Sequence, residues 1–360
     1  MIVSTLRLRN FRNYEFLNIA LDPKMNWITG DNAQGKTNLL ESLVVLSIMR
    51  SFRIADDRKL IRSGCDFADL ACRVQAEREI LLRAVIHPGG KTLFRDRQPV
   101  MKTSEFIGIL NTVLFSPDDL GIFLDAPAAR RKLLDQEITK VSSGYLFALR
   151  KYRSLLKDRN TLLRQASVDR SYLEVLEERM RAESALIIKE RREFITSLNE
   201  RIKDLYRKLS GEDRLLSLQY LCCIRDRKEE EGLEALYEST REKDMELRMT
   251  TSGIHREDIV FTLDGENVIY TASQGQKRMI MLAMKLAFIP YIEEKRGSRA
   301  VLLLDDVLSE LDEERQRRLV GLIRNTGQCV ITGTQMPDFL RSEAPKEFTV
   351  SRGKMIGGIE

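Results

Sequence analysis

One octapeptide restricts the fold of this chain more than any other part of its sequence. It matches the pattern GxxxxGK[ST] and consists of Gly30, Asp31, Asn32, Ala33, Gln34, Gly35, Lys36 and Thr37. A β-like run at residues 25–30 leads into it, and the apolar pattern of residues 36–49 after it is helical. A glycine-rich loop between a strand and a helix is the P-loop of nucleotide-binding proteins. The sequence therefore predicts an α/β fold with a phosphate site.

The residue types in the octapeptide suit the binding of ATP with Mg²⁺. Glycines let the backbone wrap the phosphates, and free N–H groups at the start of the helix donate to them. Lys36 is expected to bridge the β- and γ-phosphates, and the Thr37 hydroxyl is expected to ligate Mg²⁺. The alternative is an ordinary glycine turn before a helix.

A second motif supplies the carboxylates that such a metal needs. The apolar run of residues 301–304 ends in Asp305 and Asp306, which is the Walker B pattern. Adjacent carboxylates repel unless a cation compensates them. We expect Asp305 to hold Mg²⁺, directly or through water, and Asp306 to orient or deprotonate the attacking water. Lys36, Asp305 and Asp306 are thus the predicted catalytic residues; the alternative for the acidic pair is a solvated turn.

Two further segments resemble motifs of the ABC ATPase class. Ser273, Gln274, Gly275 and Gln276 resemble its signature sequence, and residues 309–312 resemble its D-loop, in which we single out Ser309 and Asp312. The resemblance implies that the signature of one chain contacts the γ-phosphate held by a second chain. The positive end of a helix and a serine hydroxyl suit that contact. The alternative for Ser273 is a simple helix N-cap.

Proline and charge divide the chain into regions. No proline occurs between Pro127 and Pro290, and residues 126–250 contain 27 basic and 23 acidic side chains. Apolar residues there recur at helical spacing, with turn signals near residues 167–171 and at Gly211. We expect two or three antiparallel helices, about 50 Å long. Their role is either packing alone or that of a lever or DNA-contacting arm.

The flanking regions have α/β character. Short β-like runs occupy residues 2–9, 25–30, 69–76, 80–86, 112–115, 259–263, 300–304 and 328–332, and a second helical pattern covers residues 276–289. The predicted fold class is α/β, an ABC/SMC-type P-loop ATPase head with an inserted all-helical arm domain. The head comprises residues 1–125 and 251–360, and the arm comprises residues 126–250.

Cysteine, histidine and apolar runs exclude other classes of protein. The five cysteines form no CxxC pair, so neither a zinc site nor a disulfide framework is indicated, and the presence of only two histidines argues against a histidine-rich metal centre. No apolar run approaches a membrane span, and the first residues lack the pattern of a signal peptide. We expect a cytoplasmic protein that does not bind membranes.

The chain resembles the RecF family of bacterial DNA replication and repair proteins over nearly its full length. The resemblance rests on the P-loop, Walker B, signature and D-loop segments and on residues 6–14, 50–53, 115–120, 130–135 and 253–258. It implies an SMC-like head that forms an ATP-dependent homodimer, binds gapped or junction DNA without sequence preference, and hydrolyses ATP weakly with DNA stimulation. It also implies cooperation with RecR and RecO in loading RecA during recombinational repair and replication-fork recovery.

The chain departs from the family pattern in places. Ile254 stands where the family usually has proline, and Gly333 interrupts a threonine run. No switch histidine follows residues 330–332, so Thr332 and Thr334 are the candidate γ-phosphate sensors. Asp306 stands where ABC transporters usually have glutamate, and its shorter side chain suggests slow ATP hydrolysis. We expect a Q-loop near residues 116–118.

Local excesses of basic residues nominate DNA contacts. The candidates are Arg50, Arg53 and Arg58 after the P-loop helix, and Arg130, Arg131 and Lys132 at the start of the arm. Such side chains would bind phosphates without reading sequence. The alternative for each is a solvated face with salt-bridging partners. Two other functions remain open from the residues alone, a small-molecule kinase and a scaffold that binds ATP without hydrolysing it.

Overall fold

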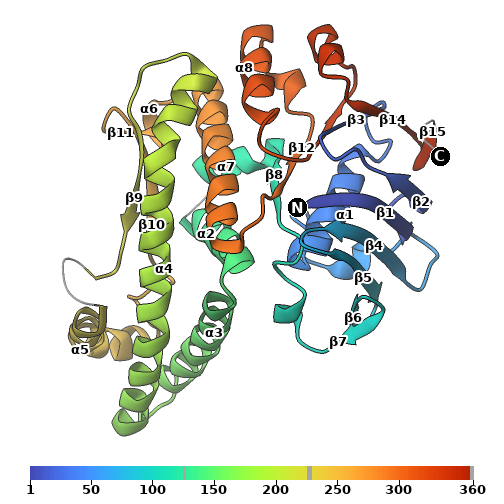
Figure 1. Ribbon diagram of the computed structural model, residues 1–360. Helices are drawn as coiled ribbons and strands as arrows, with labels where there is room; N and C mark the ends of the chain where they lie inside the picture. Colours follow the sequence, from blue (N-terminus) through green and yellow to red (C-terminus); the bar gives the residue numbers. More distant parts are fainter. Residues whose placement is uncertain (125–126, 225–228, 357–360) are drawn as a thin grey trace. The chain divides into compact units, whose positions relative to one another are not determined.

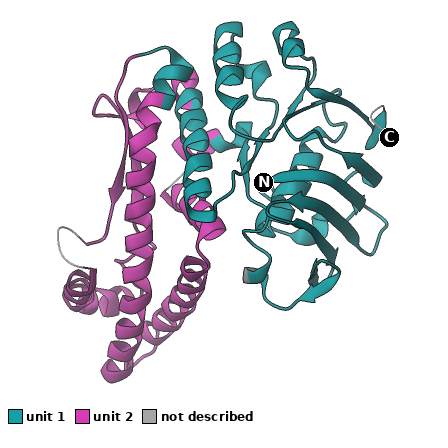
Figure 2. Cartoon of the chain, viewed as in Figure 1, with its two compact units in different colours: residues 1–119, 205–212, 278–360 teal, residues 120–204, 213–277 magenta. Residues whose placement is uncertain are grey.

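The computed structural model describes residues 1–124, 127–224 and 229–356. These residues form two compact units. Unit 1 contains residues 1–119, 205–212 and 278–360, and unit 2 contains residues 120–204 and 213–277 (Figure 2). The expected boundary at residues 125 and 126 lies outside the described residues. The expected head included residues 251–277, which the structure groups with unit 2.

Unit 1 contains a mostly parallel sheet of six strands in the order β15-β14-β3-β13-β12-β8. Its strands are β3 (Met25–Thr29), β8 (Thr112–Phe115), β12 (Val301–Leu304), β13 (Cys329–Gly333), β14 (Lys346–Ser351) and β15 (Lys354–Ile356). β15 alone runs antiparallel to its neighbour. β8, β12 and β13 are buried throughout, because a parallel sheet is covered on both faces.

The second sheet of unit 1 is antiparallel, in the order β2-β1-β4-β5-β6-β7. Its strands are β1 (Ile2–Phe11), β2 (Tyr14–Ala20), β4 (Ala68–Gln75), β5 (Glu79–His87), β6 (Gly90–Arg95) and β7 (Gln98–Val100). Buried residues alternate with half-buried or exposed ones along β1 and β5, so one face of this sheet packs on the core and the other faces solvent.

Helix α1 (Lys36–Ile48) contacts strands of both sheets. It is buried on all sides, as expected of a helix whose apolar residues show no single stripe. The core cluster around it takes Leu6 and Leu82 from one sheet and Leu303 and Val330 from the other. The helix that begins in the P-loop is therefore fixed in the centre of the unit.

Unit 1 contains further helical segments (Figure 1). They are α8 (Glu313–Ile323) and the 3₁₀ segments η1 (Asp57–Leu60), η2 (Thr103–Glu105), η3 (Pro117–Phe123, shared with unit 2), η4 (Leu308–Glu310) and η5 (Asp338–Glu343). Helices α4 (Arg170–Ser210) and α7 (Gln274–Arg296) contribute residues to both units.

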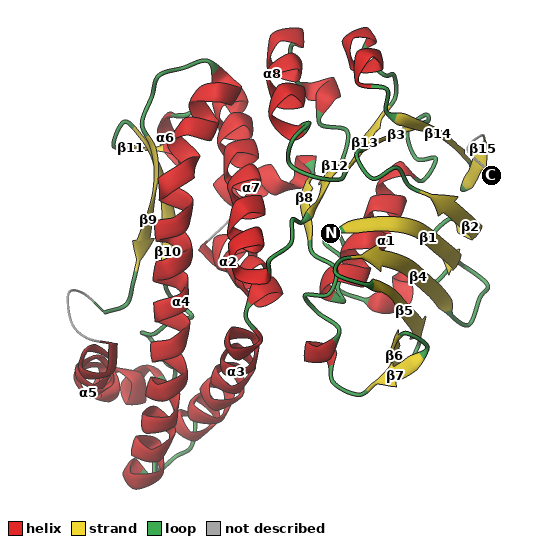
Figure 3. Ribbon diagram, in the orientation of Figure 1, coloured by secondary structure: helices red, strands yellow, loops and turns green. Residues whose placement is uncertain are grey.

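Unit 2 is largely helical (Figure 3). Besides parts of α4 and α7 it contains α2 (Pro127–Val141), α3 (Ser143–Leu163), α5 (Glu229–Leu247), α6 (Val268–Thr271) and a small sheet of β9 (Leu216–Leu221), β10 (Asp258–Leu263) and β11 (Glu266–Asn267). The turn signals are confirmed, since α3 ends before residue 167 and Gly211, with φ of 76°, follows α4.

Ion pairs confirm that the long helices are antiparallel. Arg159 and Lys151 of α3 pair with Glu177 and Glu183 of α4, in opposite chain order. Arg159 is fully buried and also donates to Asp244 at 2.8 Å. Loss of one partner would leave a buried charge uncompensated, which is costly. These ion pairs therefore favour this register of the helices.

Parts of the predicted fold were wrong. The inserted segment is not all-helical, because residues 216–221 form β9; their apolar residues Leu216 and Leu218 alternate with polar ones, which is a strand pattern. β2, β6, β7, β11, β14 and β15 were also not predicted. In the part of the chain that is described, no helix combines the length and the hydropathy that crossing a bilayer requires.

Gly333 illustrates how tightly the parallel sheet is packed. A Cβ atom at this position would lie 2.6 Å from a ring carbon of Trp27, the buried indole on neighbouring β3. Trp27 therefore accounts for the glycine that interrupts the threonine run.

We predict that Gly333→Ala lowers the free energy of unfolding by about 1–3 kcal/mol, because the methyl group overpacks the sheet. The matched control Gly321→Ala lies on α8 with open space around the new Cβ, and should be neutral or stabilising by roughly 0.5–1 kcal/mol. Urea unfolding followed by fluorescence of the single tryptophan measures both. A Gly333→Ala chain as stable as the wild type would contradict this packing.

Candidate nucleotide-binding site

The predicted motifs meet at one edge of the mostly parallel sheet. β3, β13, β12 and β8 run parallel, so the segments after their carboxyl ends lie side by side. The P-loop follows β3, Asp305 and Asp306 follow β12, and Thr334 follows β13. Ligands bind at this edge in open α/β sheets.

Backbone geometry explains the glycines of the P-loop. Gly30 and Gly35 have φ of 153° and 123°, in the region that side chains disfavour. A Cβ on Gly30 would lie 2.4 Å from the Val350 carbonyl oxygen, and one on Gly35 would lie 2.6 Å from the Asn13 amide. Ala33 also has a positive φ, of 64°. The loop can follow this path only with glycine at both ends.

The turn between β1 and β2 holds the P-loop from outside. The Asn13 amide donates to the Gln34 carbonyl at 2.7 Å and accepts from the Asn38 amide at 2.9 Å. The Tyr14 hydroxyl donates to the Gly35 carbonyl at 2.9 Å. Sequence reasoning assigned no role to Asn13 or Tyr14, because their contacts with the loop span more than twenty residues of chain.

The side chain of Lys36 folds back onto the P-loop. Its side chain is buried, and Nζ donates to the carbonyl oxygens of Gly30 at 2.5 Å and Asp31 at 3.0 Å. The ammonium group is thus held inside the curve of the loop, where the backbone positions it for an anion.

Asp305 links three segments of the site. Its Oδ1 accepts from the Thr37 hydroxyl at 3.0 Å and from the Thr332 hydroxyl at 2.9 Å. The Thr332 hydroxyl in turn accepts from the Asp306 N–H at 3.0 Å. One hydrogen-bonded chain therefore joins the P-loop helix, β13 and the Walker B carboxylates.

The electrostatics of the two aspartates suit a cation. Burial raises the pKa of Asp305, although the hydrogen bonds from Thr332 and Thr37 oppose the rise. Asp306 adopts a left-handed backbone with φ of 53°, and its buried Oδ1 has no hydrogen-bond partner among the described residues. A buried carboxylate oxygen without a hydrogen-bond donor is compatible with a cation as its partner.

These oxygens fit Mg²⁺, which favours hydroxyl, carboxylate and phosphate oxygens. Thr37 and Asp305 would hold the ion, and Asp306 would lie beside it. When bound, the ion would neutralise charge on the phosphates.

A cavity of about 710 Å³ connects the motifs. Its lining includes Lys36, Thr37, Asp305 and Asp306 together with three further basic residues, Arg12, Arg53 and Lys59. Several cations around one cavity match the charge of a nucleoside triphosphate. Neither Arg12 nor Lys59 was assigned to the phosphate site, because they come from the β1–β2 turn and η1, far from any phosphate motif.

Arg12 is held firmly in this cavity. It makes two hydrogen bonds of 2.8 Å to the buried carboxylate of Glu41 on α1. Its backbone N–H donates to the Leu60 carbonyl, and its Nη1 donates to the Lys59 carbonyl at 3.1 Å. The Arg12–Glu41 ion pair, together with these bonds to Leu60 and Lys59, holds the segment that carries Lys59 against α1.

The two predicted γ-phosphate sensors differ in exposure. Thr332 is fully buried, and its hydroxyl donates to Asp305 and accepts from the Asp306 N–H, so it links the two aspartates; its role as a sensor stays a prediction. Thr334 is exposed, and its carbonyl accepts from the Thr29 hydroxyl at 2.8 Å. The segment where we expected a Q-loop follows β8, next to Asp305.

The signature and D-loop residues form regular local structure. Ser273 and Gln276 form a reciprocal cap at the start of α7, at 3.2 and 3.0 Å, while Gln274 and Ser273 are exposed. The Ser309 hydroxyl donates to the Asp306 carbonyl at 2.7 Å, and Asp312 caps α8. Ser273 is therefore the N-cap of α7. The start of this helix is exposed, and exposed helix N-termini can bind anions.

The DNA candidates separate into different environments. Arg130 is wrong as a DNA contact, because it is buried and bonded to Asp258 at 2.8 Å; a count of charges cannot reveal such a partner. Arg131 donates to the Glu257 carbonyl, and Arg58 pairs with Asp56 at 2.9 Å. Arg53 lines the nucleotide cavity. Arg50 and Lys132 are exposed.

One cluster in unit 2 has metal-ligand composition. The ligand atoms of Cys222, Cys223 and Glu257 lie within 4.8 Å of one another. Glu257 already accepts from Arg191 at 2.6 Å, from the Tyr220 hydroxyl and from the Cys223 N–H. The carboxylate thus serves the packing of unit 2.

The chain is similar to known proteins over nearly its full length. A family model for the RecF/RecN/SMC N terminal domain matches residues 2–355. Curated relatives named DNA replication and repair protein RecF come from Lactobacillus johnsonii, Lactobacillus delbrueckii subsp. bulgaricus and Agathobacter rectalis. They are 35%, 38% and 38% identical, over 98%, 99% and 99% of this chain and 98%, 97% and 99% of their own.

The chain is also similar to solved structures of RecF and of Smc heads. The chain is similar to a structure described as the recombination mediator protein RecF-ATP in the RecFOR pathway, with 29% identity, a TM-score of 0.89 and 98% of both chains covered. An Smc head domain from Pyrococcus furiosus matches at 20% identity and a TM-score of 0.56, over 99% of this chain and 96% of that one. The second match shows a shared fold.

We predict that Asp305→Asn stabilises the nucleotide-free chain by about 1 kcal/mol at neutral pH. Because the folded pKa is raised, the ionised carboxyl opposes folding, and asparagine keeps the acceptor for both threonines. The gain should shrink as pH falls through the folded pKa, where the wild-type carboxyl is protonated too. Thermal unfolding at several pH values measures it. A destabilised Asp305→Asn chain at neutral pH would contradict this account.

Proposed function

This chain belongs to the RecF family, and from that premise we propose that it is an ATP-dependent DNA-binding protein of recombinational repair and replication-fork recovery. The observation that carries the proposal is the hydrogen bond between Thr37 and Asp305, because it joins a P-loop to a Walker B carboxylate as ATP with Mg²⁺ requires. A relative described as RecF-ATP supports ATP as the nucleotide.

The residues of the site have distinct proposed roles. The P-loop N–H groups and Lys36 would bind the phosphates, with Arg53 and Lys59 adding positive charge at the cavity wall. Thr37 and Asp305 would hold Mg²⁺. Asp306 would accept a proton from, or orient, the attacking water. An aspartate has a shorter reach than a glutamate, which supports slow hydrolysis.

The signature supports a dimer. Ser273 and Gln274 are exposed at the N-terminus of a 23-residue helix, where N–H groups and the helix dipole favour a phosphate. We infer that Ser273 to Gln276 contact the γ-phosphate bound to a second copy, with Ser309 and Asp312 near the contact. ATP would then stabilise the homodimer, and hydrolysis would release it.

DNA and partner proteins complete the proposal. The ATP-bound homodimer would hold gapped DNA or a junction of single and double strands without reading sequence, and DNA would stimulate its weak hydrolysis. We propose that it acts with RecR and RecO in loading RecA. The description of a relative as a recombination mediator of the RecFOR pathway supports these partners.

We predict that Ser273→Arg keeps ATP binding but loses the ATP-dependent dimer, since a long cation would fill the space of the second chain's phosphate. Light scattering with Mg²⁺ and ATP should give the mass of one chain, 41.5 kDa, against twice that for the wild type. Ser342→Arg, an exposed serine in η5, is the control and should dimerise. A normal Ser273→Arg dimer would disprove contact in trans.

We predict that Asp306→Asn lowers ATP hydrolysis roughly 100-fold or more while retaining ATP binding, because it removes the proposed general base. The ATP-bound dimer should persist for longer than that of the wild type. Asp338→Asn, almost fully exposed in η5, serves as the control. Undiminished phosphate release by Asp306→Asn would remove this residue from the reaction.

A further inference from the structure

The solvent-facing side of the antiparallel sheet carries a set of aligned arginines. One row of paired residues crosses five strands of the sheet. It runs from Asn18 of β2 through Arg7 of β1, Ala71 of β4 and Arg83 of β5 to Phe94 of β6. The adjacent rows contain Arg73 beside Thr5, and Arg9 beside Phe16. We name this surface the arginine face; its members are Arg7, Arg9, Arg73, Arg83 and the turn residue Arg97.

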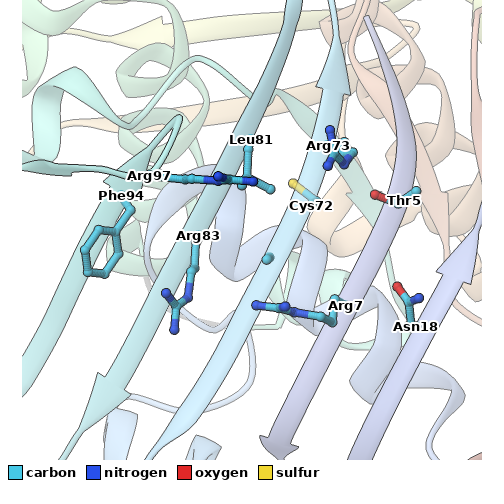
Figure 4. Close-up of a pocket in the computed structure, with 10 residues that line it drawn as sticks. Thr5, Arg7, Asn18, Cys72, Arg73, Leu81, Arg83, Phe94 and Arg97 are labelled. Carbon is cyan, nitrogen blue, oxygen red and sulfur yellow. The ribbon is translucent and has the colours of Figure 1, made fainter.

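The arginine face is hollowed. A cavity of about 650 Å³ is lined by Arg7, Arg73, Arg83 and Arg97, together with the short side chains of Thr5 and Ala71. Figure 4 shows the four arginine side chains around the pocket, on three neighbouring strands and the turn after β6. The hollow arises because small residues alternate with long ones across the strands.

Positive charge exceeds negative charge on this face. Arg7 and Arg83 share one buried carboxylate, that of Asp69, at 3.3 and 2.8 Å. Arg73 pairs with the exposed Glu79, and Arg97 has no ion-pair partner among the described residues. The side chains of Arg7, Arg73 and Arg83 remain 46%, 47% and 39% exposed. Their donors are therefore accessible to an external anion.

Aromatic rings lie among the arginines. Phe16 is 60% exposed and stands opposite Arg9, and the Arg83 guanidinium lies over the Phe94 ring at 5.3 Å. Exposed rings interleaved with guanidinium groups on an open sheet are typical of surfaces that stack nucleic-acid bases and bind phosphates. An acidic peptide would use the cations and leave Phe16 without a partner.

We propose that the arginine face binds single-stranded DNA, with its arginines on the phosphates and Phe16 against a base. This inference rests on the proposed function and gives it a location, separate from the nucleotide cavity, since the two cavities share no lining residue. The candidates chosen from local charge missed it, because these arginines are spread over β1, β4, β5 and a turn and meet only in the folded sheet.

The experiment measures binding of a fluorescent oligothymidine by anisotropy, in Mg²⁺ and ATP, over a series of salt concentrations. The test variant is Arg73→Glu with Arg97→Glu, which leaves the buried Asp69 and both of its partners intact. The charge-matched control is Arg324→Glu with Arg341→Glu, two exposed arginines on other elements. ATP binding is measured in every sample, and a duplex of equal length and a polyglutamate peptide are the competing ligands.

We expect the test variant to bind oligothymidine about 10-fold or more weakly, and to lower the salt slope by about 1.4, the value for two lost phosphate contacts on a single strand. Phe16→Ala should weaken binding at least about fivefold, and Phe16→Trp should restore it. ATP binding and the control variant should match the wild type.

Several outcomes would overturn the inference. Unchanged oligothymidine binding by the test variant refutes the arginine face and leaves the proposed function standing. Equal loss of duplex binding with no effect of Phe16→Ala contradicts the single-strand assignment. Loss of polyglutamate binding alone indicates a protein partner instead. A wild-type chain that binds ATP but no DNA of either form overturns the inference and the proposed function together.

Discussion

The site depends on the hydrogen bonds that converge on the Asp305 carboxylate. Thr37 reaches it from the P-loop helix and Thr332 from β13, and Thr332 also holds the Asp306 backbone. Burial raises the pKa of this carboxyl, so the ionised form destabilises the nucleotide-free fold. A cation bound beside the carboxylate would compensate that cost. The sheet order places β13 between the strands that carry the two motifs, and this arrangement allows one threonine to connect them.

The phosphate and metal residues were predictable because their signals are local. A P-loop needs a strand, a glycine turn and a helix in sequence, and the Walker B pair ends an apolar strand, so Lys36, Thr37, Asp305 and Asp306 can be found without a structure. The residues that complete the cavity are different. Arg12 and Lys59 reach it only because the β1–β2 turn and η1 fold onto α1 around the buried Glu41.

Charge was the least reliable guide. Arg130 lies in a basic cluster yet is buried against Asp258, and Arg53 belongs to the nucleotide cavity. The arginine face was not predicted at all, because no short window of the sequence contains more than two of its members. Its one local signal is the alternation of Leu6 and Leu8 with Arg7 and Arg9, which places two cations on one side of β1. Strand pairing then adds the others, and pairing is not visible in a single sequence.

The most direct test of the account is calorimetric titration of the unaltered chain with ATP, first in Mg²⁺ and then with the metal chelated. Because Thr37 and Asp305 are joined at the proposed metal position, we expect one ATP per chain and an affinity at least about 10-fold weaker without Mg²⁺. Equal affinity in both conditions would show that the Asp305 link has no part in nucleotide binding, and absence of binding in Mg²⁺ would contradict the site itself.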